Sequence, residues 1–306
     1  MNLNLETSRR ADTVKTPTLT RKELIDDLGT RLGSRSEATW IIEDVLGSRT
    51  SSIPNDAFVR LNELVERRIA GEPLQYLLGH WSFREIDLIV DGRVLIPRPE
   101  TEQVVEVALA ELARTTATRQ KDRALVVDIG TGSGSIALSI SAEAGLAIPG
   151  MRVLGTDVDA DALELARENL ERVSLDRPHC REQVEFFVGD LFGALGEHLK
   201  GQIDLVVSNP PYVDASEWPD LDPEVRREPL RALLALPGSD GTLGFGLVEH
   251  VVESAPAWLS DAGVLVVEIA PHQSAAALLT ASNAGFRDLF VVPDLAGRER
   301  ALVARK

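Results

Sequence analysis

The 306-residue sequence contains a single cysteine, Cys180, which excludes an intramolecular disulfide framework. A chain without disulfides fits a reducing compartment, so we expect a cytoplasmic protein. Its few histidines are scattered without the spacing of metal ligands, and we therefore expect no metal site. They are His80, His179, His198, His250 and His272.

Long hydrophobic runs are also missing. No stretch is long enough to span a membrane, and residues 2–19 lack the apolar segment of a signal peptide. Residues 1–19 are rich in Thr and Arg and poor in apolar side chains, which predicts a disordered tail. We therefore expect neither a membrane-spanning segment nor a membrane partner.

Positive charge is scarce: the sequence has 32 Lys and Arg residues against 48 Asp and Glu residues, which gives a formal net charge of −16. Such an acidic chain is poorly steered toward phosphate backbones. The charge thus argues against duplex DNA or ribosomal RNA as a substrate, and we expect no direct nucleic-acid substrate.

The length and the apolar pattern predict two domains joined by a short linker. Helical spacing of apolar residues predicts a small helical, substrate-binding domain over residues 20–75. Alternation over residues 81–94, with a turn at Asp91-Gly92, predicts a β-hairpin linker within residues 76–98. The predicted helices of the first domain are Arg21–Leu32, Ser36–Leu46 and Asp56–Ala70.

Residues 99–306 alternate between strand and helix patterns, beginning with a helix over Glu102–Ala113. This alternation predicts an α/β fold with a doubly wound, mostly parallel sheet. Residues 286–292 and 301–304, with a turn between them, predict an antiparallel pair at the C-terminal end of that sheet.

A glycine-rich loop follows the first predicted strand of this domain, residues 124–129. Glycines permit positive φ and let a ligand approach the backbone closely. The G-x-G-x-G spacing differs from the G-x-G-x-x-G dinucleotide fingerprint. Alone, it indicates a nucleotide site of unspecified type or a tight turn. The loop residues are Gly130, Thr131, Gly132, Ser133 and Gly134.

Two further predicted strands end near acidic residues. Residues 151–156 lead to Asp157, an acid that could accept both hydroxyls of a ribose or could simply cap the next helix. Residues 184–188 lead to Asp190 and Leu191, which could contact an adenine amine and its ring face. With the glycine loop and the next motif, this order predicts a site for S-adenosylmethionine.

The strand Ile203–Ser208 runs directly into Asn209-Pro210-Pro211-Tyr212. An amide nitrogen is a poor nucleophile with two N–H donors, so a site that methylates it needs two acceptors. The Asn209 side-chain oxygen and the main-chain carbonyl of Pro210, held rigid by proline, can supply them. Tyr212 can offer its ring as a wall. Pro-Pro can also be a stiff turn, but the upstream loop favours a pocket for a planar NH2 group.

These motifs resemble the class I methyltransferases that modify planar nitrogens, and further blocks are similar to the HemK/PrmC family of release-factor glutamine N5-methyltransferases. The resemblance covers roughly residue 20 to the end. It departs at Arg227, where the family often has an aromatic residue, and at Ala270, where it tends to have Gly. The blocks that carry it are Asp128–Gly134, Asn209–Tyr212, Gly71–Gly79, Leu95–Glu102 and Asp294–Arg300.

The resemblance implies a substrate, a methyl donor and their contacts. The substrate is the glutamine of the Gly-Gly-Gln loop in class I peptide chain release factors, the donor is S-adenosylmethionine, and we expect a monomer whose helical domain grips the release factor. Residues Arg98–Thr101 either pack over the donor or form an extended lead-in to the next helix. The implied catalytic and glutamine contacts are Asn209, Pro210, Pro211 and Tyr212. The implied donor contacts are Gly130, Thr131, Gly132, Ser133, Gly134, Asp157, Asp190, Leu191 and Asn209.

Three alternatives stay open at this point. The same chemistry could act on a glutamine of a ribosomal protein. An adenine amine would fit the same pocket, as in an adenine N6-methyltransferase, although the acidic charge and the helical first domain argue against nucleic acid. A non-catalytic donor-binding protein is a third alternative, against which the intact Asn209, Asp157 and glycine loop argue.

Overall fold

The computed structural model describes residues 20–47, 55–119 and 123–306, so the predicted tail over residues 1–19 lies outside the described residues. The chain divides into two compact units between Leu77 and Leu78. None of the helices in the described ranges combines the length and the apolar character that crossing a membrane requires.

The first unit is helical, with Leu24, Leu28, Ile41 and Leu61 fully or almost fully buried in its core. Thr20 starts α1 with a capping box, because its side chain accepts from the Glu23 amide while the Glu23 carboxylate accepts from the Thr20 amide. The helices are α1 (Arg21–Leu32), α2 (Arg35–Leu46), α3 (Asn55–Ile69) and α4 (Leu74–Leu78).

A short antiparallel hairpin, β1 (His80–Phe83) with β2 (Ile86–Ile89), opens the second unit. Its turn is formed by Arg84 and Glu85, so the prediction that the hairpin turns at Asp91-Gly92 is wrong. A separate turn does lie at Asp91-Gly92, where the Val94 amide donates to the Asp91 carbonyl at 3.2 Å. Arg84 adopts a φ of 50°, which is uncommon outside glycine. Its guanidinium donates to Glu143 at 2.5 and 2.7 Å, and these tertiary contacts decide the turn over local propensity.

A seven-stranded sheet forms the centre of the second unit as the structure describes it, in the order β5-β4-β3-β6-β7-β9-β8. The strands from β5 to β7 are parallel, while β9 runs antiparallel to both of its neighbours. The predicted α/β fold with a mostly parallel sheet and an antiparallel C-terminal strand is confirmed. The strands are β3 (Leu125–Ile129), β4 (Arg152–Asp157), β5 (Val184–Val188), β6 (Ile203–Ser208), β7 (Leu259–Glu268), β8 (Asp288–Pro293) and β9 (Glu299–Arg305).

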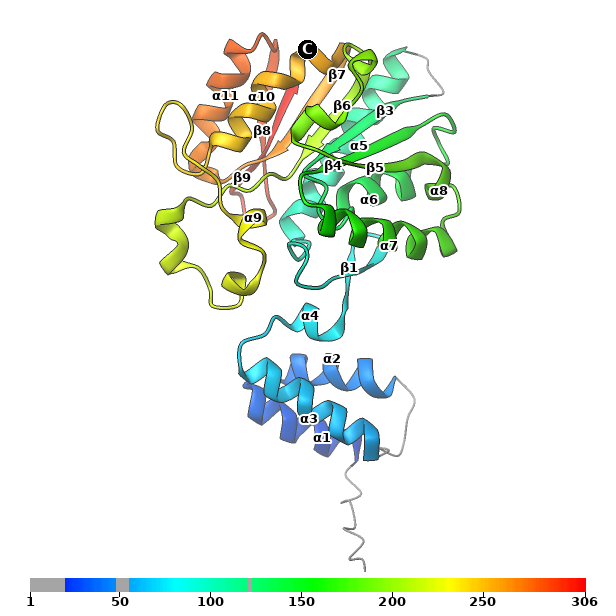
Figure 1. Ribbon diagram of the computed structural model, residues 1–306, viewed down its shortest axis with the longest axis vertical. Helices are drawn as coiled ribbons and strands as arrows, with labels where there is room; N and C mark the ends of the chain where they lie inside the picture. Colours follow the sequence, from blue (N-terminus) through cyan, green and yellow to red (C-terminus); the bar gives the residue numbers. More distant parts are fainter. Residues whose placement is uncertain (1–19, 48–54, 120–122) are drawn as a thin grey trace, which may run out of the picture. The chain divides into compact units, whose positions relative to one another are not determined.

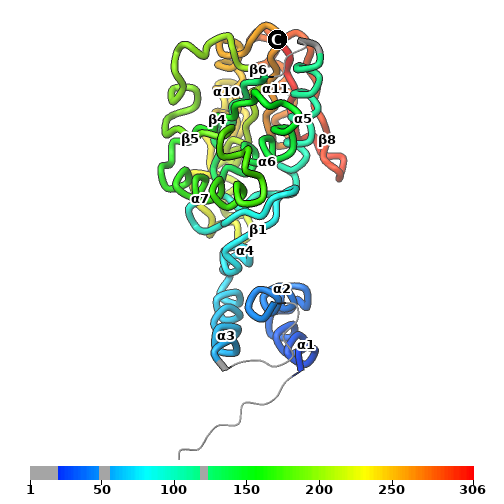
Figure 2. The backbone as a smooth tube through the Cα atoms, turned by 90° about the vertical axis from the view of Figure 1, so that its right-hand side faces the viewer, coloured from blue at the N-terminus to red at the C-terminus, as the bar shows by residue number. Residues whose placement is uncertain are grey.

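Helices cover both faces of this sheet, as Figures 1 and 2 show. Successive strand residues face opposite layers: Val126 packs in the cluster that contains α5, α6 and α7, and Val127 in the one that contains α10 and α11. The buried strands are therefore apolar on both faces, as parallel sheets require. The helices are α5 (Pro99–Arg119), α6 (Ser135–Ala144), α7 (Ala160–Asp176), α8 (Cys180–Gln183), α10 (Gly246–Trp258) and α11 (Ser274–Asn283).

The helix predicted over Glu102–Ala113 begins earlier, at Pro99, so Arg98–Thr101 is not an extended lead-in. Proline suits the first helical position, because the N–H that it lacks would have no partner there. The Thr101 amide donates to the Arg98 carbonyl at 3.0 Å, which places Thr101 in the first turn. The remaining short helices are η1 (Leu191–Ala194), η2 (Glu197–Leu199), η3 (Ala215–Asp220), η4 (Val225–Arg227), α9 (Leu230–Leu233) and η5 (Pro271–Gln273).

Candidate active site

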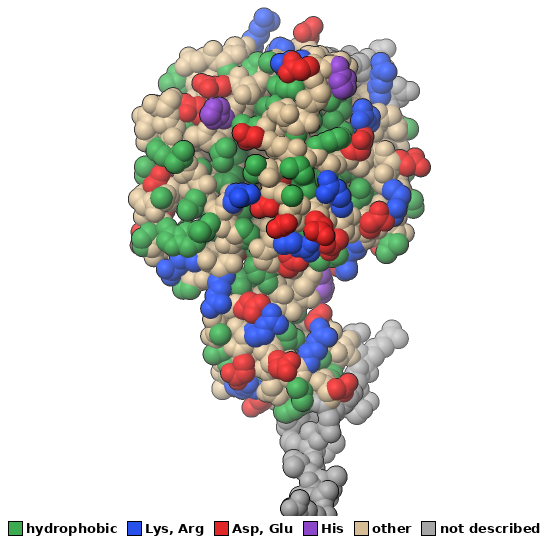
Figure 3. Space-filling view, in the orientation of Figure 1, with side chains coloured by type: hydrophobic (Ala, Val, Ile, Leu, Met, Phe, Trp, Pro, Cys, Tyr) green, Lys and Arg blue, Asp and Glu red, His purple; other side chains and the backbone are tan. Residues whose placement is uncertain are grey.

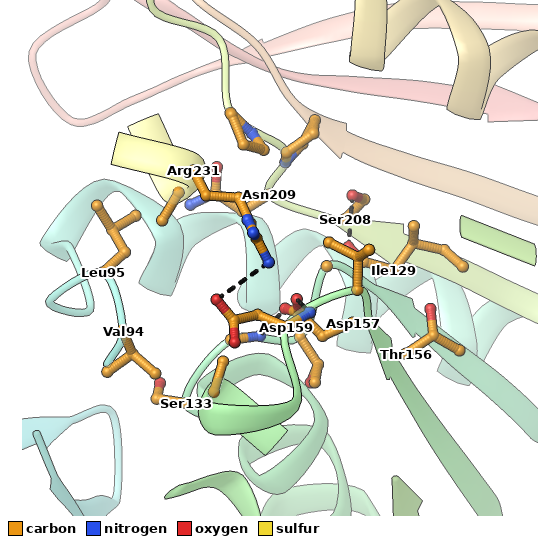
Figure 4. Close-up of a pocket in the computed structure, with 18 of the residues that line it drawn as sticks. Val94, Leu95, Ile129, Ser133, Thr156, Asp157, Asp159, Ser208, Asn209 and Arg231 are labelled. Carbon is orange, nitrogen blue, oxygen red and sulfur yellow. Dashed lines mark hydrogen bonds and ion pairs between the residues drawn. The ribbon is translucent and has the colours of Figure 1, made fainter. Parts of the chain in front are cut away.

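A cavity lies at the carboxyl ends of the central strands and encloses ≈ 1120 Å³ of empty space, part of it open to solvent. Ligands bind at this edge in open α/β sheets, because the loops after neighbouring parallel strands meet there. Most of the predicted site residues line it, and Figure 4 shows Asp157, Ser133 and Asn209 around it. The predicted residues in its lining are Gly130, Thr131, Gly132, Ser133, Asp157, Asp190, Leu191, Asn209, Pro210 and Pro211.

The glycine loop offers bare backbone to this cavity. Gly130 and Gly132 have φ of 70° and 53°, and a Cβ added at either position would meet nothing within 4 Å. Side chains there would project into open space that a ligand could otherwise occupy. Gly134 does not line the cavity. It caps α6 with a φ of 80°, and an added Cβ would lie 3.1 Å from Phe186.

Asp128 braces this loop from within the core. Its Oδ2 accepts from the Thr131 hydroxyl at 2.5 Å and from the Ala137 amide at 3.2 Å. Burial raises the pKa of Asp128 to about 7, although these two hydrogen bonds oppose the rise. In the described part of the chain, its Oδ1 has no hydrogen-bond partner.

Asp157 stands at the end of β4, opposite the loop. Its two oxygens accept from the amides of Gly132 and Asp159, each at 2.9 Å, and burial raises the pKa of the carboxyl. A carboxylate has about four acceptor positions, so capacity for further donors remains. The neighbouring Thr156 also lines the cavity, and its Oγ1 is unpaired within the described ranges. The remaining capacity of Asp157 is chemically compatible with the ribose contact predicted from the sequence, whereas Thr156 is fully buried.

Leu191 adopts a φ of 47° as it lines the cavity beside Asp190. A left-handed backbone at a non-glycine residue is strained, and such strain concentrates at functional sites. The Gly189 amide donates to the Asp157 carbonyl at 2.9 Å, so Asp190 and Leu191 lie next to Asp157 in the cavity. Their contact with an adenine stays a prediction.

Asn209 is held by a hydrogen-bond chain that reaches into the core. Its Nδ2 donates to Thr101 Oγ1 at 2.9 Å, and Thr101 Oγ1 donates to Glu268 Oε2 at 2.7 Å. The Asn209 side-chain oxygen is thereby left to accept from a ligand. Burial raises the pKa of Glu268 to about 7. Tyr212 does not line the cavity; its hydroxyl donates to Glu268 Oε1 at 3.4 Å.

The backbone after Asn209 is supported from behind by a later loop. Gly244 has a φ of 62°, and an added Cβ would lie 2.0 Å from the Tyr212 carbonyl oxygen. Gln273, which is fully buried, donates to the carbonyl of Leu243 at 3.0 Å and to that of Tyr212 at 3.4 Å. Val213 pairs with the segment that follows α9. Sequence reasoning did not find these supports, because no local pattern marks a residue that packs against a distant loop.

Arg98 and Arg231 are among the residues that line the cavity; the resemblance placed Arg98 near the donor, whereas nothing in the sequence indicated Arg231. Arg98 lines the cavity and pairs with the buried Glu228, which also accepts from the Ile96 amide at 2.9 Å. Burial raises the pKa of Glu228, while Arg98 opposes that rise. Arg231 extends from α9 toward Asp159 at 3.4 Å, as Figure 4 shows. These cations could receive the carboxylate of an amino-acid ligand.

The chain is similar to known methyltransferases over most of its length. A family model described as the methyltransferase small domain matches residues 105–222, and one described as the PrmC N-terminal domain matches residues 28–79. A release factor glutamine methyltransferase of Deinococcus radiodurans is 38% identical over 278 residues, covering 88% of this chain and 90% of that protein. Proteins of the same name from Chlorobaculum tepidum and Rhodopirellula baltica are 38% and 35% identical, over 77% and 81% of this chain and 75% and 78% of their own lengths.

Proposed function

Since the chain belongs to the release factor glutamine methyltransferase family, we propose that it methylates the side-chain amide nitrogen of a release-factor glutamine, with S-adenosylmethionine as donor. The proposed glutamine is that of the Gly-Gly-Gln loop in class I peptide chain release factors. The observation that carries the proposal is the orientation of Asn209. Its amide oxygen is free to accept, at the carboxyl end of β6 and beside the glycine loop.

The donor site would be built from the loops after β3, β4 and β5. When bound, S-adenosylmethionine supplies a methyl group made electrophilic by the sulfonium to which it is attached. Gly130 and Gly132 leave room for it, and Asp157 has acceptor capacity for its ribose hydroxyls. Asp190 and Leu191 would contact the adenine.

The acceptor amide would be positioned by two oxygen atoms. The lone pair of an amide nitrogen is delocalised into its carbonyl, so the nitrogen attacks poorly unless it is held and polarised. Asn209 Oδ1 and the Pro210 carbonyl would accept its two N–H groups and aim the lone pair at the methyl carbon. The N–C bond would form as the methyl S–C bond breaks, and its electron pair would stay on the sulfur, which leaves as a neutral thioether. The nitrogen becomes acidic as it gains the methyl group, and its proton can pass to water without a strong base in the site.

The alternatives differ in substrate. On the face drawn in Figure 3, Lys and Arg side chains are interspersed with Asp and Glu, which offers little attraction to a phosphate backbone. We therefore keep the release factor as the proposed partner and regard nucleic acid as a less favoured substrate. The monomeric state, the cytoplasmic location and the substrate-binding role of the first unit remain predictions.

The proposal is tested by incubating an unmethylated release factor with this protein and S-adenosylmethionine, followed by mass spectrometry of the Gly-Gly-Gln peptide. We expect one added methyl group, located on the glutamine by fragmentation. Ribosomal proteins and an adenine-containing oligonucleotide serve as parallel substrates. Methylation of either of these, with the release factor unmodified, would contradict the proposal.

A further inference from the structure

We propose that Thr101 and Glu268 are positioning residues that fix the side-chain amide of Asn209 with its oxygen facing the acceptor site. The inference rests on the proposed function, because that function requires Asn209 to accept from an amide N–H. Neither residue touches the reacting atoms in this scheme. Both act through the amide that they orient.

The need for such a device follows from the shape of asparagine. The oxygen and nitrogen of its side-chain amide are nearly equal in size, so packing alone does not choose between the two orientations. In the reversed orientation, the NH2 group would face the substrate amide and repel its N–H donors. An interaction that distinguishes the two atoms is therefore required.

The Thr101 hydroxyl supplies that distinction. It has one proton, which it donates to Glu268 Oε2 at 2.7 Å, and it can then only accept from its other neighbour. That neighbour is Asn209 Nδ2, at 2.9 Å. Reversing the amide would place two lone-pair-bearing oxygens against each other.

Burial makes the arrangement firm. Thr101 is 2% exposed and Glu268 is 0% exposed, so water cannot replace either partner. The hydrogen bond between Thr101 and Glu268 joins the first turn of α5 to the end of β7, and the two residues are 167 positions apart in the sequence. An acceptor at Glu268 thus controls, through one hydroxyl, which atom Asn209 presents to the cavity.

Several charged and titratable groups face Glu268. Tyr212 donates to it from the loop after β6, the Arg300 guanidinium from β9 favours its ionised form, and Glu100 on α5 opposes that form. Arg300 is itself paired with Asp294 at 3.6 Å. Burial outweighs these effects and raises the pKa of Glu268 to about 7.

The direction of the pH effect follows from donor counting. Above this pKa, Glu268 is a carboxylate and must accept from Thr101. Below it, the protonated carboxyl can donate to Thr101, which frees the Thr101 proton to point at Asn209 and favours the reversed amide. Turnover should therefore fall as the pH drops through about 7.

Threonine variants test the hydroxyl. Thr101→Val keeps the shape but removes the hydrogen bonds, and we expect kcat to fall about tenfold while donor affinity stays within about twofold. Thr101→Ser restores the hydroxyl and should restore kcat. The matched control is Thr115→Val on the same helix, because Thr115 is 1% exposed and its Oγ1 is unpaired among the described residues. It should leave kcat unchanged.

Glu268→Gln tests the titration. A glutamine can accept from Thr101 but cannot take up a proton in this range, so the fall of kcat toward low pH should disappear. Other buried acids near the site also have raised pKa values: Asp128, at about 7, and Asp157 and Glu228. If the acid limb persists in Glu268→Gln, the titration belongs elsewhere and the inference is overturned in this respect.

A measurement without substrate separates this inference from the proposed function. In 15N-labelled protein, the Asn209 side-chain resonance, assigned with Asn209→Asp, reports its hydrogen bond to Thr101. In wild type and Thr101→Ser, we expect the Asn209 NH2 signal to be shifted from its usual position and its protons to exchange slowly with water. In Thr101→Val, both properties should be lost.

If the resonance behaves so but no methyl reaches a release factor, the proposed function fails and the positioning role stands. If methyl transfer occurs while Thr101→Val changes neither the resonance nor kcat, the positioning role fails and the proposed function stands.

Discussion

At the scale of single residues, Asn209 and Asp157 separate the two halves of the proposed reaction. Asn209 follows β6 and offers an amide oxygen. Asp157 ends β4, and its carboxylate lies beside the glycine loop, where it accepts from the Gly132 amide. Substituting Asn209 should therefore impair methyl transfer, and substituting Asp157 should impair donor binding. This division can be measured because turnover and donor affinity are independent readouts.

Replacing Asn209 by alanine removes one of the two acceptors proposed for the glutamine amide. We expect Asn209→Ala to lower kcat by about 100-fold or more, the range seen when one oriented polar group is removed from an active site. The measurement is the rate of methyl incorporation into the release factor at saturating donor. A kcat within a few-fold of wild type would show that Asn209 does not position the nitrogen.

Replacing Asp157 by alanine removes the acceptor proposed for the ribose. We expect Asp157→Ala to weaken donor binding about tenfold or more in titration calorimetry, since hydrogen bonds to charged groups are the stronger ones. Asp161→Ala, which removes an exposed carboxylate in the first turn of α7, is the control and should bind normally. Equal affinities for both variants would refute the donor-site assignment.

At the scale of elements, the local patterns predicted the bounds of α1, β5 and β6 as they stand in the structure. Each is bounded by a strong signal, such as the capping box of α1 or the prolines after β6. The predicted position of the hairpin turn and the predicted start of α5 were wrong. The first depends on Arg84 binding a distant helix, and the second on Pro99 occupying the first helical position.

The candidate site shows the same limit. Residues that directly follow a strand, such as Asp157 and Asn209, could be predicted because parallel strands present their carboxyl ends at one edge. Thr101, Gly244 and Glu268 could not, because their contacts join segments far apart in sequence. Nothing in the neighbourhood of Thr101 signals a partner on β7.

The loop behind Asn209 gives a prediction at this scale. In Gly244→Ala, the added Cβ would lie 2.0 Å from the Tyr212 carbonyl oxygen and must displace that backbone. The control Gly241→Ala has a similar positive φ of 85°, but its Cβ meets nothing within 4 Å. Both variants should lose about 1–2 kcal/mol of stability from backbone strain.

Gly244→Ala alone should also lower kcat by about tenfold or more, because a small displacement of catalytic groups is costly. Urea denaturation and single-turnover kinetics of both variants would measure the two effects. A kcat as low in Gly241→Ala as in Gly244→Ala would mean that strain, rather than contact with the Tyr212 backbone, is responsible.

At the scale of the whole molecule, the helical first unit carries exposed apolar side chains. Val59 and Ile69 on α3 are 57% and 54% exposed. If this unit grips the release factor, as predicted from the sequence, these side chains belong to the surface that matters. The contribution of this unit to substrate binding should then be larger for an intact release factor than for a short peptide.

The double variant Val59→Asp, Ile69→Asp tests this role. We expect KM for an intact release factor to rise about fivefold or more, because apolar contacts at an interface would be replaced by charges. KM for a short Gly-Gly-Gln peptide should not change. The control carries Leu175→Asp and Leu279→Asp on α7 and α11, which are similarly exposed. An equal rise for peptide and release factor would contradict a gripping role.

The sequence by itself determined the motifs, the alternation of strands and helices, and which side chains follow each strand. These depend on neighbours in the chain, whose preferences are local. The tertiary structure alone decided the strand order, which places β3 between β4 and β6 and so brings Asp157, the glycine loop and Asn209 to one cavity. It also decided that Glu268 lies behind Thr101, because burial and hydrogen bonding between distant segments exist only once the chain has folded.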